Sequence, residues 1–160
     1  MQMLTPHLPM EIVNGVAARD RGAFFSPLHQ VAVRSVRMSR SIEIEDRDDF
    51  VLIVYSGEFD MQSAKETIDR ILQACSEKHC STALLDCRNM TGIITTLDRF
   101  EAAIYGQVIK DTVSRMAVVG PPGLVLSGPF FENVARNRGL NMRVFLDMDK
   151  AVGWLKGLSW

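Results

Sequence analysis

From residue 41 onward, short apolar runs alternate with amphipathic segments, and this alternation limits the folds open to the chain. The runs at residues 50–55, 83–85, 116–119 and 142–146 are apolar and have the length of buried strands. Between them, apolar residues recur at every third or fourth position, which is typical of helices that cover a sheet. Short strands that alternate with helices predict a largely parallel sheet with right-handed connections.

The first two strands differ from the others in how they are joined. Residues 41–45 alternate around Ile42 and Ile44, and a polar turn at 46–49 separates them from the next apolar run. Two strands joined by so short a turn pair as an antiparallel hairpin. We therefore expect an α/β fold in the order ββαβαβαβα, with a mixed, mostly parallel sheet of about five strands flanked by helices.

Helix starts are marked by residues that commonly cap helices. Asp60, Thr95 and Asp147 each precede a helical pattern, and we expect all three to be N-caps. Gly128 and Pro129 open a further helix in the favoured order of a cap followed by proline.

Two apolar stripes predict how the later helices pack. The helix after Thr95 has its stripe at Leu97, Phe100, Ile104 and Val108. We expect the last helix to pack on the sheet beside Val118 and Val144, with Trp154 at the rim. Its stripe consists of Met148, Ala151, Val152, Leu155 and Leu158.

Residues 1–40 have a different character from the rest of the chain. They carry five arginines against two acidic residues, and they show no sustained helical or strand period. We expect an irregular arm that packs loosely on a domain of residues 41–160, so that residues 1–37 can be deleted. In an alternative interpretation, residues 1–37 are an upstream extension, because Met38 directly precedes the first strand pattern.

Composition and motifs argue against several classes of function. The net charge of −1 gives no sign of nucleic acid binding, and no run approaches the roughly 20 apolar residues of a membrane span. The sequence lacks a phosphate-binding loop, a hydrolase serine elbow and the paired cysteines of a zinc site. We therefore expect a protein that is not an enzyme and uses no metal or cofactor. An odd number of cysteines and no signal peptide fit the cytoplasm, and Cys87, beside Arg88, could be a mildly activated thiol.

The expected carboxyl ends of the strands carry the polar candidates. Asp86, Arg88 and Asn89 follow the third strand, and Gly120 and Gly123 follow the fourth. Open α/β sheets bind ligands at this edge, so these five residues form a candidate ligand-binding crevice. In the alternative interpretation, they only satisfy loop amides and form turns.

Two segments are similar to a known family. Residues 83–88 (ALLDCR) and 143–155 (RVFLDMDKAVGWL) resemble the SpoIIAA-like, STAS-type family of small bacterial domains, and the resemblance extends over about residues 41–158. It implies a mixed sheet with one antiparallel edge, flanked by helices. It also implies a non-enzymatic role in regulation or protein interaction, because better-understood STAS relatives are antagonists of anti-sigma factors, while other relatives bind small ligands.

The resemblance also suggests a phosphorylation switch. Those antagonists are phosphorylated on a serine or threonine after the third strand, in an Asp-Ser-Ser-Gly pattern at a helix start. The pattern falls here on residues 94–97, which keep two hydroxyls, Thr95 and Thr96, but lack the acidic residue and the glycine. The local sequence alone makes Thr95 an N-cap, so both roles are open for it.

The connection between the third strand and the next helix suggests where a partner could bind. Taken as residues 87–96, it is longer than the usual two to six or so residues of such a loop. It contains Met90, Ile93 and Ile94, which have no period that would bury them all. We interpret it as a docking loop for an unknown protein partner; alternatively, these residues close the core. A homodimer and a domain that binds a small apolar or anionic ligand in the crevice are the other hypotheses.

Overall fold

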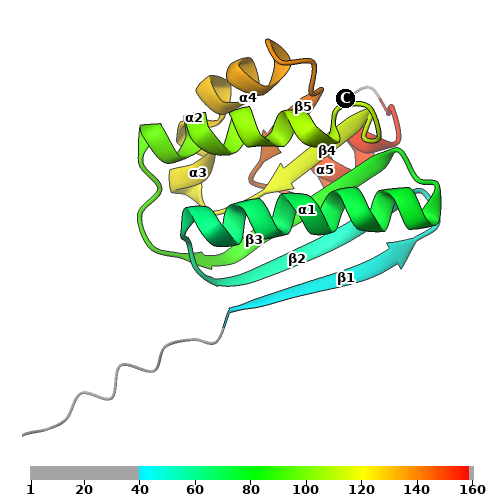
Figure 1. Cartoon of the computed structure of the whole chain (residues 1–160), viewed down its shortest axis with the longest axis horizontal. Coiled ribbons are helices and arrows are strands. Elements are labelled where there is room, and N and C mark those ends of the chain that lie inside the picture. The colour runs from blue at the N-terminus through cyan, green and yellow to red at the C-terminus, as the bar shows by residue number, and fades with distance from the viewer. Residues whose placement is uncertain (1–39, 159–160) are drawn as a thin grey trace, which may run out of the picture. The chain divides into compact units, whose positions relative to one another are not determined.

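The computed structural model describes residues 40–158, and they form an α/β fold around a five-stranded sheet (Figure 1). The predictions for residues 1–37 lie outside the described residues. The strands are β1 (Ser41–Arg47), β2 (Phe50–Glu58), β3 (Thr82–Thr91), β4 (Arg115–Val119) and β5 (Met142–Phe145).

The sheet has the order β1-β2-β3-β4-β5, so each strand lies beside its neighbour in sequence. Strand β1 is antiparallel to β2, with Arg47 opposite Phe50 at the hairpin turn. The other neighbouring pairs are parallel. The predicted mixed sheet with one antiparallel edge is therefore confirmed.

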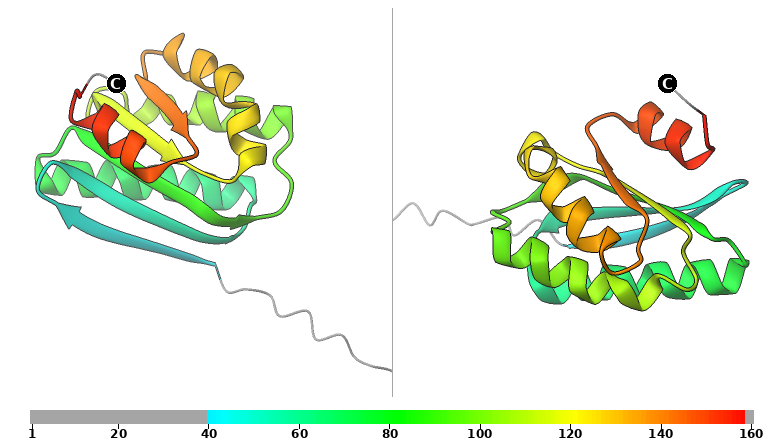
Figure 2. Two further views of the ribbon diagram at one scale, coloured as in Figure 1. Left: turned by 180° about the vertical axis from the view of Figure 1, so that it is seen from behind. Right: turned by 90° about the horizontal axis from the view of Figure 1, so that it is seen from above.

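Helices cover both faces of the sheet. Helices α1 (Met61–Lys78), α2 (Thr96–Tyr105) and α4 (Gly128–Arg136) lie on one face, and α5 (Met148–Leu155) lies on the other (Figure 2). The prediction did not include two short elements, the 3-10 helix η1 (Gly106–Ile109) and α3 (Pro122–Leu126). Within residues 40–158, no helix combines the length and the apolar character needed to cross a membrane.

The three predicted N-caps are confirmed by their hydrogen bonds. Asp60 Oδ1 accepts from the Ser63 amide at 2.7 Å, and Asp147 Oδ1 accepts from the Lys150 amide at 2.9 Å. At the start of α2, Thr95 Oγ1 accepts from the amide of Asp98. Each bond satisfies an amide that the first helical turn leaves without a partner.

The larger of two apolar cores lies between the sheet and helices α1, α2 and α4. Ile53 of β2, Ile71 of α1 and Met142 of β5 are almost fully buried in it. Cys75 is also buried there. Each large side chain buried in this way contributes about 1.5–3 kcal/mol.

The smaller core lies under α5, and one prediction about it was wrong. Ala151 and Leu155 pack against residues such as Leu84 of β3 and Ala117 of β4. The expected partners Val118 and Val144 instead belong to the larger core. Side chains alternate between the two faces of a strand, so the neighbours of α5 are one residue away from those expected.

Strand β3 is much longer than predicted. It continues beyond Leu85 to Thr91, because its second half stays paired with β2 up to the pair Glu58 and Thr91. The pairing tolerates the polar residues through a shift of register between Val54 and Ser56. The connection to α2 is therefore only residues 92–95, and the expectation of an overlong loop was wrong.

The apolar stripe predicted for the helix after Thr95 is largely exposed. The exposed fractions are 63% for Leu97, 38% for Phe100 and 46% for Val108. In α2 itself the only fully buried residue is Ala103. The helix therefore faces the core with small side chains and presents much of its apolar stripe to solvent, the reverse of the expected packing.

Candidate functional site

Asp86 lies opposite Val119, the residue before Gly120, but the five residues of the predicted crevice do not all line one pocket. The side chains of Asp86 and Arg88 line a groove on the α5 side of the sheet. Gly120 packs against Leu124, whose side chain belongs to the larger core on the opposite side. The Gly123 carbonyl accepts a hydrogen bond from α2.

The long β3 strand explains this separation. Asp86 and Arg88 are two residues apart on one strand, so their side chains project from the same face. Asn89 is exposed further along β3, beyond the register shift. Because β3 does not end at Asp86, the polar residues that follow it do not form a loop at the edge of the sheet.

Asp86 and Arg88 form a closely bonded ion pair. The Asp86 carboxylate accepts from Arg88 Nε at 2.9 Å, from Nη2 at 2.8 Å and from the Arg88 amide at 3.0 Å. Burial alone would raise the pKa of Asp86, but these hydrogen bonds from Arg88 outweigh it and lower the pKa. Two of the three guanidinium nitrogens of Arg88, Nε and Nη2, therefore already serve Asp86.

Other charges in this groove are also engaged with one another. Arg47 pairs with Glu45 of the same strand, and Lys156 pairs with Asp49 at 2.7 Å. All four side chains line the groove, together with apolar residues of β2 and α5. Six of the seven charged residues that line the groove are therefore paired with one another, and the seventh, Asp48, forms no ion pair among the described residues. Exposed pairs of this kind are common on solvated surfaces.

The expectation of an activated thiol at Cys87 was wrong. Its side chain projects away from Arg88 into the larger core, where it is 6% exposed. Burial, with a smaller contribution from the charge of Asp86, raises the pKa of Cys87 to about 12. A thiol with such a pKa stays protonated and is a poor nucleophile near neutral pH.

The interaction residues predicted from the sequence fall into two groups. Met90 and Ile94 are partly buried and pack against the larger core. Ile93 is 87% exposed at the short turn into α2. Leu97, in the first turn of α2, and Leu126, in α3, are also strongly exposed, at 63% and 85%.

These exposed apolar residues belong to the turn into α2, to the first turn of α2 and to the last position of α3. The starts of α2 and α3 lie near the carboxyl ends of the parallel strands (Figures 1 and 2). Arg99 Nη2 of α2 donates to the Gly123 carbonyl of α3 at 3.3 Å, which ties the two helices together. We call this region, defined by Ile93, Leu97 and Leu126, the α2–α3 end.

Thr95 and Thr96 are both exposed at this end, with different environments. The Thr95 hydroxyl donates to Asp98 Oδ2 at 2.6 Å, and the Thr95 amide donates to the same oxygen at 2.8 Å. These two hydrogen bonds lower the pKa of Asp98. Thr96 is the first residue of α2.

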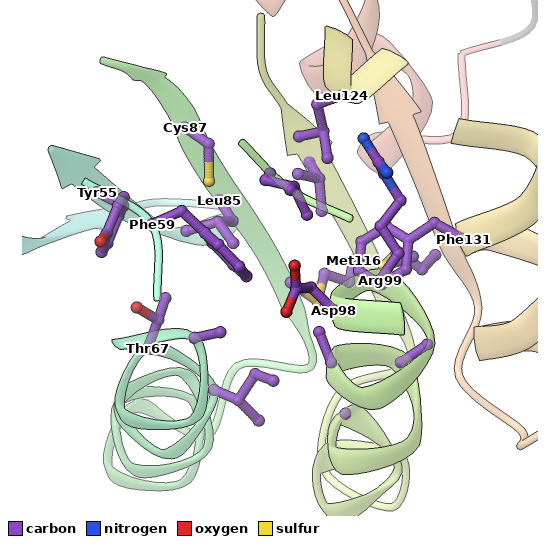
Figure 3. Close-up of a pocket in the computed structure, with 18 of the residues that line it drawn as sticks. Tyr55, Phe59, Thr67, Leu85, Cys87, Asp98, Arg99, Met116, Leu124 and Phe131 are labelled. Atoms are coloured by element: carbon purple, nitrogen blue, oxygen red, sulfur yellow. The ribbon is translucent and has the colours of Figure 1, made fainter. Parts of the chain in front are cut away.

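Beneath α2 lies an apolar cavity that the sequence analysis missed. It has a volume of about 90 Å³, and its walls come from the sheet, from η1 and from helices α1, α2, α3 and α4. Figure 3 shows Phe59, Leu85, Met116 and Leu124 around it. The sequence did contain one signal, the small residues Ala102, Ala103 and Gly106, which recur on one face of α2 and η1 and line the cavity.

Asp98 and Arg99 are the charged residues on the lining of this cavity (Figure 3). Asp98 is engaged by Thr95, as described above. Arg99 donates through Nη2 to Gly123, but its Nε is buried and has no hydrogen-bond partner among the described residues. An unsatisfied donor of this kind is unusual, because buried polar atoms are nearly always hydrogen-bonded.

Comparison with solved structures identifies the fold. The chain is similar to an anti-sigma factor antagonist from Mycobacterium paratuberculosis, with 16% identity and a TM-score of 0.52 over 74% of this chain and 95% of that one. It is also similar to an uncharacterised protein with a SpoIIAA-like fold from Shewanella loihica PV-4, with 17% identity and a TM-score of 0.48 over 72% of this chain and 93% of that one. No family model and no curated protein matches the sequence. The chain has the STAS-type, SpoIIAA-like fold that its motifs predicted.

Proposed function

We propose that this chain is a non-enzymatic regulatory module that binds a protein partner at the α2–α3 end. The observation that carries the proposal is the exposure of Ile93, Leu97 and Leu126, at 87%, 63% and 85%. Single exposed apolar residues are common on soluble proteins. Three of them, at the turn into α2, in α2 and in α3, which the hydrogen bond from Arg99 to Gly123 joins, are more typical of a protein-binding surface.

We infer that the partner is a protein of the anti-sigma factor class. The similar structure from Mycobacterium paratuberculosis is, by its name, an antagonist of an anti-sigma factor. A domain that acts on such a protein needs an accessible apolar surface around which polar contacts can form. The α2–α3 end offers apolar side chains next to exposed hydroxyls at a helix start.

Of the two candidate phosphorylation sites, Thr96 suits a switch better than Thr95. A phosphate on Thr95 would break the hydrogen bonds that cap α2 and would lie against the Asp98 carboxylate, which repels it. A phosphate on Thr96 would lie in the first turn of α2, where the helix dipole favours negative charge. It would also add about −1.5 to −2 charge beside Leu97 and so weaken an apolar contact there.

The test is a direct binding measurement with an identified partner. Tagged full-length protein is used to capture anti-sigma-factor-type proteins from the source organism, and each is then purified and titrated. Ile93→Asp and Leu97→Asp should each weaken the affinity at least tenfold, about 1.4 kcal/mol, because each buries a charge in the contact. Thr96→Glu should also weaken the affinity for the partner, and Thr96→Val should leave it unchanged.

Leu158→Asp is the matched control for these variants. Leu158 is 58% exposed, but it lies beside Arg115, at the start of β4 and so at the opposite end of the sheet. Its replacement should leave the affinity unchanged. If folded Ile93→Asp and Leu97→Asp proteins bind as tightly as the wild type, the α2–α3 end is not the binding surface.

A further inference from the structure

We infer that the cavity beneath α2 is a binding site for a small apolar molecule that ends in a single carboxylate, which pairs with Arg99. This site is distinct from the α2–α3 surface and from the predicted crevice. The inference does not depend on the proposed function, because the cavity lies inside the larger core and needs no protein partner to form.

The walls of the cavity suit an apolar occupant better than water. Its volume of about 90 Å³ corresponds to roughly three water-sized molecules at ~30 Å³ each. A buried water needs two to four or so polar partners, and side chains such as Ile68, Leu85 and Met116 offer none. Apolar cavities of this kind stay dry or take up small apolar molecules.

Arg99 gives the site its chemical selectivity. The guanidinium is always charged, yet Arg99 forms no ion pair with any residue of the described range 40–158. Arg99 lines the cavity, its buried Nε has no acceptor among the described residues, and its Nη2 is held by the Gly123 carbonyl. A carboxylate is the acceptor that best matches a guanidinium, because the hydrogen bond is then assisted by charge.

Asp98 limits the charge that the occupant can carry. Its carboxylate also lines the cavity, and it is already the acceptor for the Thr95 amide and hydroxyl, so it is held in place as an anion. It would repel a dianion such as a phosphate ester more strongly than a monoanion. A monocarboxylate with a short alkyl chain therefore matches the apolar lining, the positive charge of Arg99 and the negative charge of Asp98.

The experiment titrates the full-length protein with propanoate and butanoate, and with the neutral alcohols propanol and butanol. Affinities are measured by calorimetry, and the methyl signals of Met116 and Ala103 are followed by NMR. We expect saturable binding of a carboxylate that is at least tenfold tighter than that of its alcohol, with shifts at both methyl groups. No saturable binding of either carboxylate, or equal affinity for acid and alcohol, would overturn the inference.

Two variants distinguish the contribution of the apolar lining to binding from that of the positive charge of Arg99. Arg99→Gln should reduce carboxylate affinity at least tenfold, to the level of the alcohol, and leave alcohol binding unchanged. Ala103→Leu fills the cavity and should abolish binding of both while raising the melting temperature. Arg70→Gln, on the exposed surface of α1, is the control for loss of a positive charge and should have no effect.

The outcomes also distinguish this site from the protein-binding surface. Carboxylate binding that survives Ile93→Asp but not Ala103→Leu supports a ligand site inside the core. Binding that both Arg99→Gln and Ala103→Leu leave intact, in folded proteins, assigns the ligand elsewhere and refutes the inference. Because no partner is present in these titrations, failure of the proposed function cannot produce either result.

Discussion

At the scale of single residues, the size of a side chain decides whether α2 and η1 fill the space above the sheet. Ala103 and Gly106 face the core, where longer side chains would reach the wall, and a cavity of about 90 Å³ remains. Such a cavity costs about 2 kcal/mol at ~24 cal/mol per Å³. A bound molecule that fills it would recover part of this stability, which gives the site a thermodynamic reason to be occupied.

The Asp86 and Arg88 pair leads to a prediction about stability and pH. Arg88→Met should lower the free energy of unfolding by about 1–3 kcal/mol at pH 7, because it leaves a buried carboxylate without its partner. The pair lowers the folded-state pKa of Asp86, so its contribution is complete above the unfolded pKa of about 3.9. It is lost as the pH falls below that value.

Denaturant titrations of wild type and Arg88→Met at several pH values measure this effect. The difference between the two proteins should shrink as the pH is lowered from 7 towards 3. Arg70→Met, an exposed arginine of α1, should show no such difference at either pH. A constant difference over the whole range would mean that Arg88 stabilises the fold through packing rather than through Asp86.

The three cysteines should differ sharply in reactivity. Burial raises the pKa of Cys75 to about 11 and that of Cys87 to about 12, so both thiols stay protonated and shielded at pH 8. Cys80 is only partly buried. In native protein at pH 8, an alkylating reagent should modify Cys80 rapidly and the other two only after unfolding, as peptide mass spectrometry would show. Rapid native labelling of Cys87, or unchanged labelling in Cys80→Ser, would contradict this.

At this scale the sequence predicted local features well and spatial neighbours poorly. The capping roles of Asp60, Thr95 and Asp147 depend on residues three positions away, so the local pattern is enough to identify them. The state of Cys87 depends on which face of β3 it occupies. Its neighbour in sequence, Arg88, points to the other face, and adjacency in sequence was therefore misleading.

At the scale of elements, α5 is the helix whose contribution can be measured most directly. Leu155 is 6% exposed and packs in the smaller core, so Leu155→Ala should lower the free energy of unfolding by about 2–5 kcal/mol. Leu158 follows α5 and is 58% exposed, so Leu158→Ala should cost less than about 0.5 kcal/mol. Chemical denaturation of both variants measures the two changes in the free energy of unfolding. Equal decreases would mean that α5 does not cover the sheet.

Two elements show why pattern alone misplaced the candidate site. Strand β3 continues through Asp86 and Arg88 because β2 is long enough to pair with it there. The length of the neighbouring strand cannot be predicted from the sequence of β3 alone. Helix α2 has a clear apolar stripe, but much of that stripe is exposed, and the small residues of the helix face the core instead. A stripe identifies an amphipathic helix and leaves open which of its sides meets the core.

At the scale of the whole molecule, the alternation of strands and helices was sufficient for the fold class and for the mixed, mostly parallel sheet, but the order of the strands was not predicted. A β hairpin followed by three strand–helix units with right-handed connections admits few arrangements, and the observed sheet is the simplest of them. The cavity could not be predicted in this way. Its walls come from the sheet, from η1 and from four α-helices, so its existence depends on how residues distant in sequence fill space together.

The residues that build the two cores and the edge strand lead to a prediction about the N-terminal arm. Both apolar cores are built from residues between Ile42 and Leu155 within the described range, and the outermost strand begins at Ser41. A chain that begins at Met38 keeps this strand. It also keeps Arg40, which pairs with Asp60 at 3.3 Å and with Glu66 at 3.2 Å.

We therefore predict that removing residues 1–37 changes the melting temperature by no more than a few degrees, as measured by calorimetry. A chain that begins at Glu43 is the matched comparison. It loses Arg40 and the pairing of Ser41 and Ile42 with β2, including the contact of Ile42 with the larger core, and it should melt several degrees lower. If the chain from Met38 is insoluble or melts as low as the chain from Glu43, residues 1–37 contribute directly to the stability of the domain.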